Sequence, residues 1–277
     1  MKIKELLQQY LNSLSEIYPA PEINAIFYRL TEHFWHLNRL DIAMNPHLES
    51  PDDRLLKALQ DLRNNKPWQY ITGQTEFYQL TFKLNQNVLI PRPETEELVE
   101  WILNDCQTGS QIIDIGTGSG AIAVSLAKNC PQAQVTALDI SAEALKIATE
   151  NAHLNQVTIR AVKADILQGY DLSAYDIIIS NPPYVRESEK KQMHANVLDY
   201  EPGTALFVPD DNPLLFYEKI IDASLKNPRK QSLYFEINEN LKPQLEKLLL
   251  SKNLTEYQFK KDAYDKWRML KVLKNLK

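Results

Sequence analysis

The chain has 277 residues, of which 44% are hydrophobic, and this length allows one large domain or two smaller ones, of which we expect two. Acidic residues outnumber basic residues by 36 to 31, so the net charge is -5 and the composition offers no global electrostatic reason to bind nucleic acid. Polar residues interrupt the N-terminal segment and no apolar run approaches the length of a membrane span. We therefore predict a soluble, cytoplasmic protein without a signal peptide or a membrane partner.

Three amphipathic stripes mark the first 66 residues. Apolar side chains recur at helical spacing from Leu6 to Ile17, from Ile23 to Leu37 and from Leu55 to Leu62. Pro19 stops the first stripe and Pro67 follows the last. This pattern predicts a helical N-terminal domain over residues 1–66. The domain holds no cluster of reactive groups, which favours docking or substrate recognition over chemistry.

The next residues change to a strand-like pattern. Tyr70-Ile71-Thr72 precedes Gly73-Gln74, and a run rich in aromatic residues extends from Phe77 to Leu84. Apolar runs on both sides of a glycine-containing turn predict a hairpin, which we expect to form a linker over residues 67–86.

A third part, residues 87–277, begins with Val88-Leu89-Ile90-Pro91-Arg92-Pro93-Glu94-Thr95. The two prolines hold Arg92 in a stiff, extended segment that leads into a helix. From Gln111 onward, strand and helix patterns alternate, which predicts an α/β fold with a mostly parallel sheet and helices on both faces. The predicted strands are Gln111 to Ile115, Gln134 to Asp139, Thr158 to Lys163, Asp176 to Ser180, Ser232 to Ile237, Tyr257 to Lys260 and Met269 to Leu273.

The two cysteines and the paired histidines carry no predicted chemistry. Cys106 and Cys130 neither form a C-x-x-C pair nor suggest a disulfide framework, so we expect a reducing compartment and no role for either cysteine. His33 and His36 share a helix face, but no cluster of cysteines or acids completes a site, and we predict no metal.

A glycine-rich turn follows the first strand of the α/β part. The sequence Asp114-Ile115-Gly116-Thr117-Gly118-Ser119-Gly120 leads into an apolar helix start. Glycines allow a tight turn and the close approach of a ligand to the backbone, while the helix N-terminus offers free N–H groups. Asp139 ends the next strand, where its carboxylate can accept both hydroxyls of a ribose. These features predict a nucleotide-like cofactor but fit both dinucleotides and a methyl donor.

Two later strand ends narrow the choice. Asp165 ends the third strand and could accept a hydrogen bond from an adenine amine. The fourth strand leads into Asn181-Pro182-Pro183-Tyr184, a rigid loop. The Asn181 side-chain oxygen and the Pro182 carbonyl are acceptors that suit a substrate with an NH2 group, and Tyr184 adds a flat face on which a planar amide or base can stack.

In this ordered series the residues resemble class I S-adenosylmethionine-dependent methyltransferases, and among them the HemK/PrmC family of protein N5-glutamine methyltransferases. The resemblance covers nearly the whole chain. It rests on the helical N-terminal region, the hairpin, the segment 88–95, the turn 114–120 and the loop 181–184, together with Tyr200-Glu201-Pro202 and Ala205-Leu206.

The resemblance implies a fold, an activity and a partner. The fold is a Rossmann-like, mostly parallel sheet with an antiparallel C-terminal strand, in a methyltransferase domain over 87–277. The activity is transfer of a methyl group from S-adenosyl-L-methionine to the glutamine side chain in the Gly-Gly-Gln motif of class I peptide chain release factors. The site residues that it implies for the cofactor are Asp114, Gly116, Thr117, Gly118, Ser119, Gly120, Asp139, Asp165, Ile166 and Asn181. Those that it implies for catalysis and substrate are Asn181, Pro182, Pro183 and Tyr184, with Arg92 at the border.

The sequence departs from the family pattern near its C-terminus. Asn238 follows Glu236-Ile237 where the family usually has a glycine, and the segment 261–268 also lacks a glycine that is common there. Other functions remain open on the residues alone. They are an adenine-N6 DNA methyltransferase, a cofactor-binding interaction protein without catalysis and, with least support, a dehydrogenase.

Overall fold

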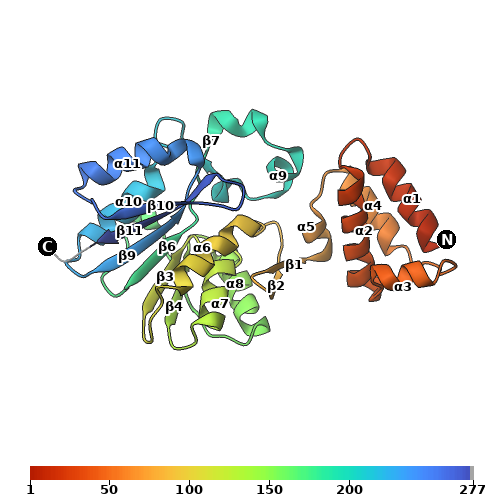
Figure 1. Cartoon of the computed structure of the whole chain (residues 1–277), viewed down its shortest axis with the longest axis horizontal. Helices are drawn as coiled ribbons and strands as arrows, with labels where there is room; N and C mark the ends of the chain where they lie inside the picture. The colour runs from red at the N-terminus through yellow and green to blue at the C-terminus, as the bar shows by residue number, and fades with distance from the viewer. Residues whose placement is uncertain (275–277) are drawn as a thin grey trace. The chain divides into compact units, whose positions relative to one another are not determined.

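The computed structural model describes residues 1–274, apart from the side chain of Gln192. The chain forms two compact units (Figure 1). The helical unit comprises Met1–Gln74 and His194–Tyr200, and the sheet unit comprises Thr75–Met193 and the chain from Glu201 onward. These two units are defined by contacts between residues. The division into three parts that the sequence suggests, residues 1–66, 67–86 and 87–277, stays a prediction.

The helical unit is built from the predicted stripes and three short helices. Its longer helices are α1 (Ile3–Leu14), α2 (Ala20–Trp35) and α4 (Arg54–Arg63), and its shorter ones are α3 (Arg39–Met44), α5 (Trp68–Thr72) and α9 (Ala195–Tyr200). The three stripes pack into one core whose members include Leu6, Tyr10, Leu14, Ile23, Phe27, Leu30, Leu55, Leu59 and Leu62. The helical prediction is therefore confirmed. The Tyr10 hydroxyl donates to the Leu55 carbonyl at 2.6 Å, so this buried polar group is paired.

The hairpin lies later in the chain than the sequence suggested. Tyr70–Thr72 belongs to α5, and Gly73 ends that helix with a φ of 69°. Gly73 is therefore a helix cap rather than a hairpin turn, and the strand prediction for Tyr70 to Thr72 is wrong. The hairpin pairs β1 (Gln74–Phe77) with β2 (Leu80–Lys83). Its two turn residues, Tyr78 and Gln79, both have positive φ, as the tightest hairpin turns require.

The sheet unit contains a seven-stranded sheet in the order β10-β11-β9-β6-β3-β4-β5. The strands β3, β4, β5, β6 and β9 run parallel, whereas β11 is antiparallel to both β9 and β10. This confirms the predicted fold class, including the antiparallel C-terminal strand. The bounds are β3 (Gln111–Ile115), β4 (Gln134–Asp139), β5 (Arg160–Lys163), β6 (Ile177–Ser180), β9 (Gln231–Glu236), β10 (Tyr257–Lys261) and β11 (Trp267–Lys274).

Helices cover both faces of this sheet (Figure 1). Alternate residues of each strand point to opposite faces, so Ile112 joins one core cluster and Ile113 joins the other. The first cluster includes residues of α6 (Pro93–Leu103), α7 (Ala121–Asn129) and α8 (Ala142–Leu154). The second includes residues of α10 (Leu215–Leu225) and α11 (Lys242–Ser251).

The strand order reverses at β3. From β3 the chain continues outward to β4 and β5, and then returns to form β6 on the other side of β3. In open α/β sheets, ligands bind in the crevice beyond the carboxyl ends of the strands at such a point. The remaining short elements of the sheet unit are β7 (Val185–Arg186), β8 (Phe207–Val208), η1 (Ile166–Gln168), η2 (Glu187–Gln192), η3 (Gly203–Ala205) and η4 (Glu239–Leu241).

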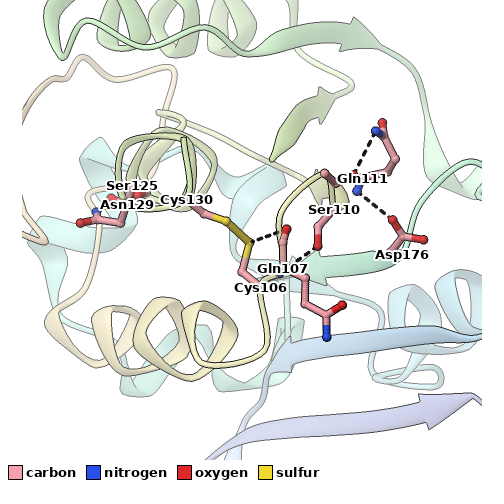
Figure 2. Close-up of a disulfide and its surroundings, with 9 residues drawn as sticks. Cys106, Gln107, Ser110, Gln111, Ser125, Asn129, Cys130 and Asp176 are labelled. Carbon is pink, nitrogen blue, oxygen red and sulfur yellow. Dashed lines mark hydrogen bonds between the residues drawn. A yellow bond between two sulfur atoms is a disulfide. The ribbon is translucent and has the colours of Figure 1, made fainter. Parts of the chain in front are cut away.

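A disulfide joins Cys106, in the loop after α6, to Cys130, the residue that ends α7 (Figure 2). The spacing of the cysteines did not suggest this disulfide, and the expectation that neither cysteine has a role is wrong. The helices α6 and α7 pack against each other on one face of the sheet, and both lead away from the same strand edge. Their C-terminal ends thus meet, although 24 residues separate the two cysteines in sequence.

In residues 1–274, no helix combines the length and the apolar character that crossing a membrane requires.

Candidate active site

The glycine-rich turn connects the end of β3 to the start of α7. Gly116, Gly118 and Gly120 have φ values of 74°, 54° and 79°, a region that residues with a side chain rarely adopt. A Cβ atom at Gly120 would lie 2.9 Å from the Cβ of Ala148, so Gly120 allows α7 to pack closely on α8. A Cβ at Gly116 or Gly118 would meet no atom within 4 Å. These two glycines therefore leave open space beside the backbone.

Asn151 connects the turn to the hairpin. This fully buried side chain of α8 donates to the Ser119 carbonyl at 2.9 Å and to the Lys83 carbonyl at 3.1 Å. Its oxygen accepts from the Lys83 N–H at 2.7 Å. All the strong hydrogen-bonding groups of the amide are thus engaged, and β2 supports the glycine turn through one side chain.

Asp114 lies buried beneath the turn. One of its carboxyl oxygens accepts from the Thr117 hydroxyl at 2.7 Å, and the other has no hydrogen-bond partner among the described residues. Burial raises the pKa of Asp114 to about 7, and the charge of Asp139 adds to this rise while the Thr117 hydroxyl opposes it. The site therefore contains a carboxyl group that changes its protonation near neutral pH.

Two further aspartates stand at the ends of neighbouring strands. Asp139 accepts from the N–H groups of Gly118 and Ser141, each at 2.9 Å. Asp165 accepts from the Leu167 N–H at 2.9 Å and so caps η1. Each carboxylate offers about four lone-pair directions, so both keep acceptor capacity beyond these bonds. The backbone fixes their orientation in advance of any ligand.

A cavity of about 370 Å³ lies at this edge of the sheet. Its size is within the range usual for small-molecule sites. The structure brings together on its wall eight of the predicted site residues, which are Gly116, Gly118, Asp139, Asp165, Ile166, Asn181, Pro182 and Pro183. The other predicted residues, which are Asp114, Thr117, Ser119, Gly120, Tyr184 and Arg92, do not line it. Sequence reasoning did not single out Asn87, Thr204 and Phe216, which also line the cavity.

The Asn-Pro-Pro-Tyr loop starts where β6 ends. Ser180, the last residue of β6, donates to the Ile115 carbonyl at 2.8 Å and so anchors the loop to β3. Within residues 1–274, neither the side-chain amide of Asn181 nor the carbonyl of Pro182 has a hydrogen-bond partner. Both lie in residues that line the cavity. The site thus presents two free acceptors on a loop that two prolines stiffen.

Tyr184 points away from this wall. Its ring packs against the core cluster beneath α10 and α11, and its hydroxyl donates to Glu236 at 3.2 Å. Burial raises the pKa of Tyr184, and the charge of Glu236 adds to the effect, so the hydroxyl keeps its proton. The expected stacking of Tyr184 on a substrate amide stays a prediction.

Two buried glutamates hold the segment 88–95. Glu201, whose side chain is 1% exposed, accepts from the Arg92 guanidinium at 2.6 Å and from the Ile90 N–H at 3.2 Å. Glu236 accepts from the Thr95 hydroxyl at 2.6 Å. In the sequence, both glutamates stand out only as parts of a family pattern. The available signal for Glu236 was a charged residue within the otherwise apolar run 233–237.

The two C-terminal departures from the family pattern differ: Asn238 has a backbone conformation open to any residue, whereas Asp265, in the segment 261–268, has a φ of 64°, a region that glycine favours. Asn238 has a φ of -76°, and its side chain accepts from the Asn240 N–H at 3.0 Å. Between β10 and β11, Asp262 accepts from the N–H groups of Tyr264 and Lys266, each at 3.0 Å. An aspartate side chain therefore organises the turn in which the family commonly has a glycine.

Comparison with known proteins identifies close relatives over nearly the full length. A family profile described as "Methyltransferase small domain" matches residues 93–201. A protein from Flavobacterium psychrophilum named release factor glutamine methyltransferase is 47% identical over 98% of this chain and 99% of its own length. A protein of the same name from Bacteroides thetaiotaomicron is 42% identical over 93% of this chain and 95% of its own length.

A likeness to solved structures concerns the fold. The catalytic domain of hMettl16, solved in complex with MAT2A 3′UTR hairpin 6, has a TM-score of 0.55 and 18% identity, with 80% of each chain covered. At that identity the likeness supports the class I methyltransferase fold and carries no information about substrate.

Proposed function

The chain belongs to the release factor glutamine methyltransferase family, whose members use S-adenosyl-L-methionine, and from this premise we propose its substrate and mechanism. The substrate that we propose is the glutamine of the Gly-Gly-Gln motif in class I peptide chain release factors. The product is methylated on the side-chain amide nitrogen, N5. We further propose that the enzyme works in the cytoplasm without direct contact with nucleic acid or membranes.

The observation that carries this proposal is the pair of free acceptors on the loop 181–184. Pro182 is buried and Asn181 is half-buried, and neither the Pro182 carbonyl nor the Asn181 side-chain oxygen has a hydrogen-bond partner among the described residues. An unpaired acceptor at a buried site costs free energy unless a ligand or water satisfies it. A planar NH2 group would satisfy both at once, and a glutamine amide is such a group.

The residues around the cavity suit the cofactor. Gly116 and Gly118 leave space for the methionine part to approach the backbone, and Asp139 keeps lone pairs for ribose hydroxyls. Asp165 and Ile166 would border the adenine. Asp114 does not line the cavity, so its unpaired oxygen beneath the turn would act on a cationic group there only through water or at a distance. When bound, S-adenosyl-L-methionine supplies an electrophilic methyl group.

The proposed role of Asn181 and Pro182 is to orient and polarise the amide. An amide nitrogen is a weak nucleophile because its lone pair is delocalised into the carbonyl. Two acceptors aimed at its hydrogens draw positive charge toward the nitrogen, and this interaction strengthens as the nitrogen becomes cationic. The amide proton becomes acidic at that stage, so the site needs no strong general base. The Asn181 and Pro182 acceptors do not titrate near neutral pH.

A labelling experiment tests the substrate. The purified protein is incubated with methyl-labelled S-adenosyl-L-methionine and, separately, with a release factor, with its Gly-Gly-Gln variant in which alanine replaces the glutamine, and with duplex DNA. Peptide mass spectrometry then locates the label. We expect label only on the glutamine of the wild-type factor. Label on DNA, or equal label on the alanine variant, would contradict the proposal and favour an adenine-type or other acceptor.

A further inference from the structure

Glu236 occupies a central position behind the catalytic loop. It is the last residue of β9, the strand beside β6, and only 2% of its surface is exposed. One carboxyl oxygen accepts from the Tyr184 hydroxyl at 3.2 Å, and the other accepts from the Thr95 hydroxyl at 2.6 Å. Its carboxyl group therefore connects the loop 181–184 to the first turn of α6.

Charged groups surround this carboxyl from other elements. The positive charge of Arg268, in β11, lowers the pKa of this carboxyl, and Arg268 also pairs with Asp262 at 3.1 Å, while the negative charge of Glu94, in α6, has the opposite effect. Burial raises the pKa of Glu236, and the Thr95 hydroxyl and the Arg268 charge oppose that rise.

The stability of the fold does not by itself explain why position 236 carries a carboxyl group. Removing a carboxyl group from water is costly, and well-packed apolar residues often replace buried charged groups without loss of stability. What a carboxyl adds is direction, because it accepts two hydrogen bonds along defined lines. Here the two donors come from a catalytic loop and from the segment that carries Arg92.

The position of Tyr184 restricts the position of Asn181 through the loop 181–184. Only Pro182 and Pro183 separate Tyr184 from Asn181, and their rings hold φ near a single value. Ser180 anchors the other end of the loop on β3. A loop fixed at both ends, with two stiff residues between, holds its acceptors in one arrangement.

We propose that Glu236 is a positioning residue for methyl transfer, which fixes Tyr184 and thereby the acceptors of Asn181 and Pro182. This inference rests on the proposed function for its kinetic consequence. It assigns no contact between Glu236 and substrate. A displacement of about 1 Å in a reacting group can lower a rate by about 100-fold, so a positioning residue affects kcat more than KM.

The test uses three variants and one matched control. Glu236→Leu removes both acceptors, Glu236→Gln keeps one acceptor of similar shape, and Tyr184→Phe removes only the hydroxyl. Glu239→Leu makes the same change as Glu236→Leu at an exposed position three residues later, in η4. The kinetics of release factor methylation, the affinity for S-adenosyl-L-methionine and the hydrogen exchange of residues 181–186 are measured for each.

For Glu236→Leu we expect kcat to fall about 100-fold while KM and cofactor affinity stay within about threefold. Glu236→Gln should recover part of the loss, and adding Tyr184→Phe to Glu236→Leu should lower kcat no further. The Val185 N–H donates to the Leu206 carbonyl at 3.0 Å, and its exchange should quicken about tenfold in Glu236→Leu and stay unchanged in Glu239→Leu.

Three results would overturn the inference: a kcat within threefold of wild type in both Glu236 variants, losses that multiply in the double variant, or unchanged exchange in the loop. If Glu236→Leu does not fold, Glu236→Gln and Tyr184→Phe supply the same comparison. If the wild-type enzyme leaves release factors unlabelled, the proposed function fails, and the exchange measurement still decides whether Glu236 holds the loop.

Discussion

At the scale of single residues, the site separates groups that titrate from groups that do not. Asn181 and Pro182 offer acceptors whose strength is the same across the physiological pH range. Asp114, beneath the glycine turn, is buried and has a pKa raised to about 7. The proposed catalytic hydrogen bonds therefore do not depend on pH in this range. The charge of Asp114, beneath the glycine turn, does depend on it.

We predict that Asn181→Ala lowers turnover by about 100- to 1,000-fold, the range seen when one preorganised group that stabilises developing charge is removed. Affinity for S-adenosyl-L-methionine, measured by calorimetry, should change by less than about fivefold because the glycine turn and Asp139 remain. Asn240→Ala, an exposed change in η4, serves as the control. Near-normal turnover in the Asn181 variant would contradict the proposed mechanism.

We also predict that Asp114 makes the cofactor-free protein less stable as pH rises. Its pKa is raised from 3.8 to about 7 on folding, so the folded state holds the proton more tightly. The stabilisation is complete below pH about 4 and is lost as pH rises through about 7, at up to about 1.4 kcal/mol per pH unit.

Denaturant unfolding of wild type and Asp114→Asn at several pH values measures this effect. The asparagine variant cannot ionise, so the difference in unfolding free energy, wild type minus variant, should fall between pH 5 and 7 and level off above about pH 8. A difference that stays constant over this range would show that Asp114 does not titrate there.

At the level of secondary-structure elements, the helices α7 and α8 and the hairpin β1–β2 support the glycine turn at the ligand-binding edge of the sheet. The helix α8 connects β2 to the glycine turn through Asn151, and α7 packs closely on α8 because Gly120 has no side chain. The ends of α6 and α7 that lie far from the site are joined by the disulfide (Figure 2). The same two helices thus carry site residues at their first turns and a covalent link beyond their last.

We predict that this disulfide stabilises the oxidised protein by about 3 kcal/mol, since it closes a loop with a sequence separation of 24. Unfolding with and without reductant measures the difference. In the Cys106→Ser/Cys130→Ser double variant, reductant should have no effect. Two thiols titrated in the denatured, unreduced protein would contradict the bond.

For the molecule as a whole, the net charge and the family membership both favour a protein substrate over nucleic acid. The net charge of -5 disfavours a phosphate backbone as partner, and the family acts on a protein. We predict that duplex DNA in excess leaves the rate of release factor methylation unchanged even at low salt, where electrostatic binding is strongest. A rate that falls with added DNA, and recovers with salt, would reveal a nucleic acid site.

Features that depend on residues adjacent in the chain could be predicted from the residues alone. A strand followed by glycines predicts its turn because glycine adopts the positive φ values found at Gly116 and Gly118 far more readily than residues with a side chain. The loop at Asn181 could be recognised because prolines restrict the chain locally. The alternation of strand and helix patterns was sufficient for the fold class.

Contacts between residues far apart in the chain became apparent only in the folded molecule. Glu236 lies 141 residues from Thr95 and 52 from Tyr184, and Glu201 lies 109 residues from Arg92. Gly73 showed the same limit on a smaller scale, because a helix cap and a hairpin turn both use its positive φ. Local patterns arise from the backbone preferences of single residues, whereas these pairs arise from the way helices pack on a sheet, and no local preference specifies that packing.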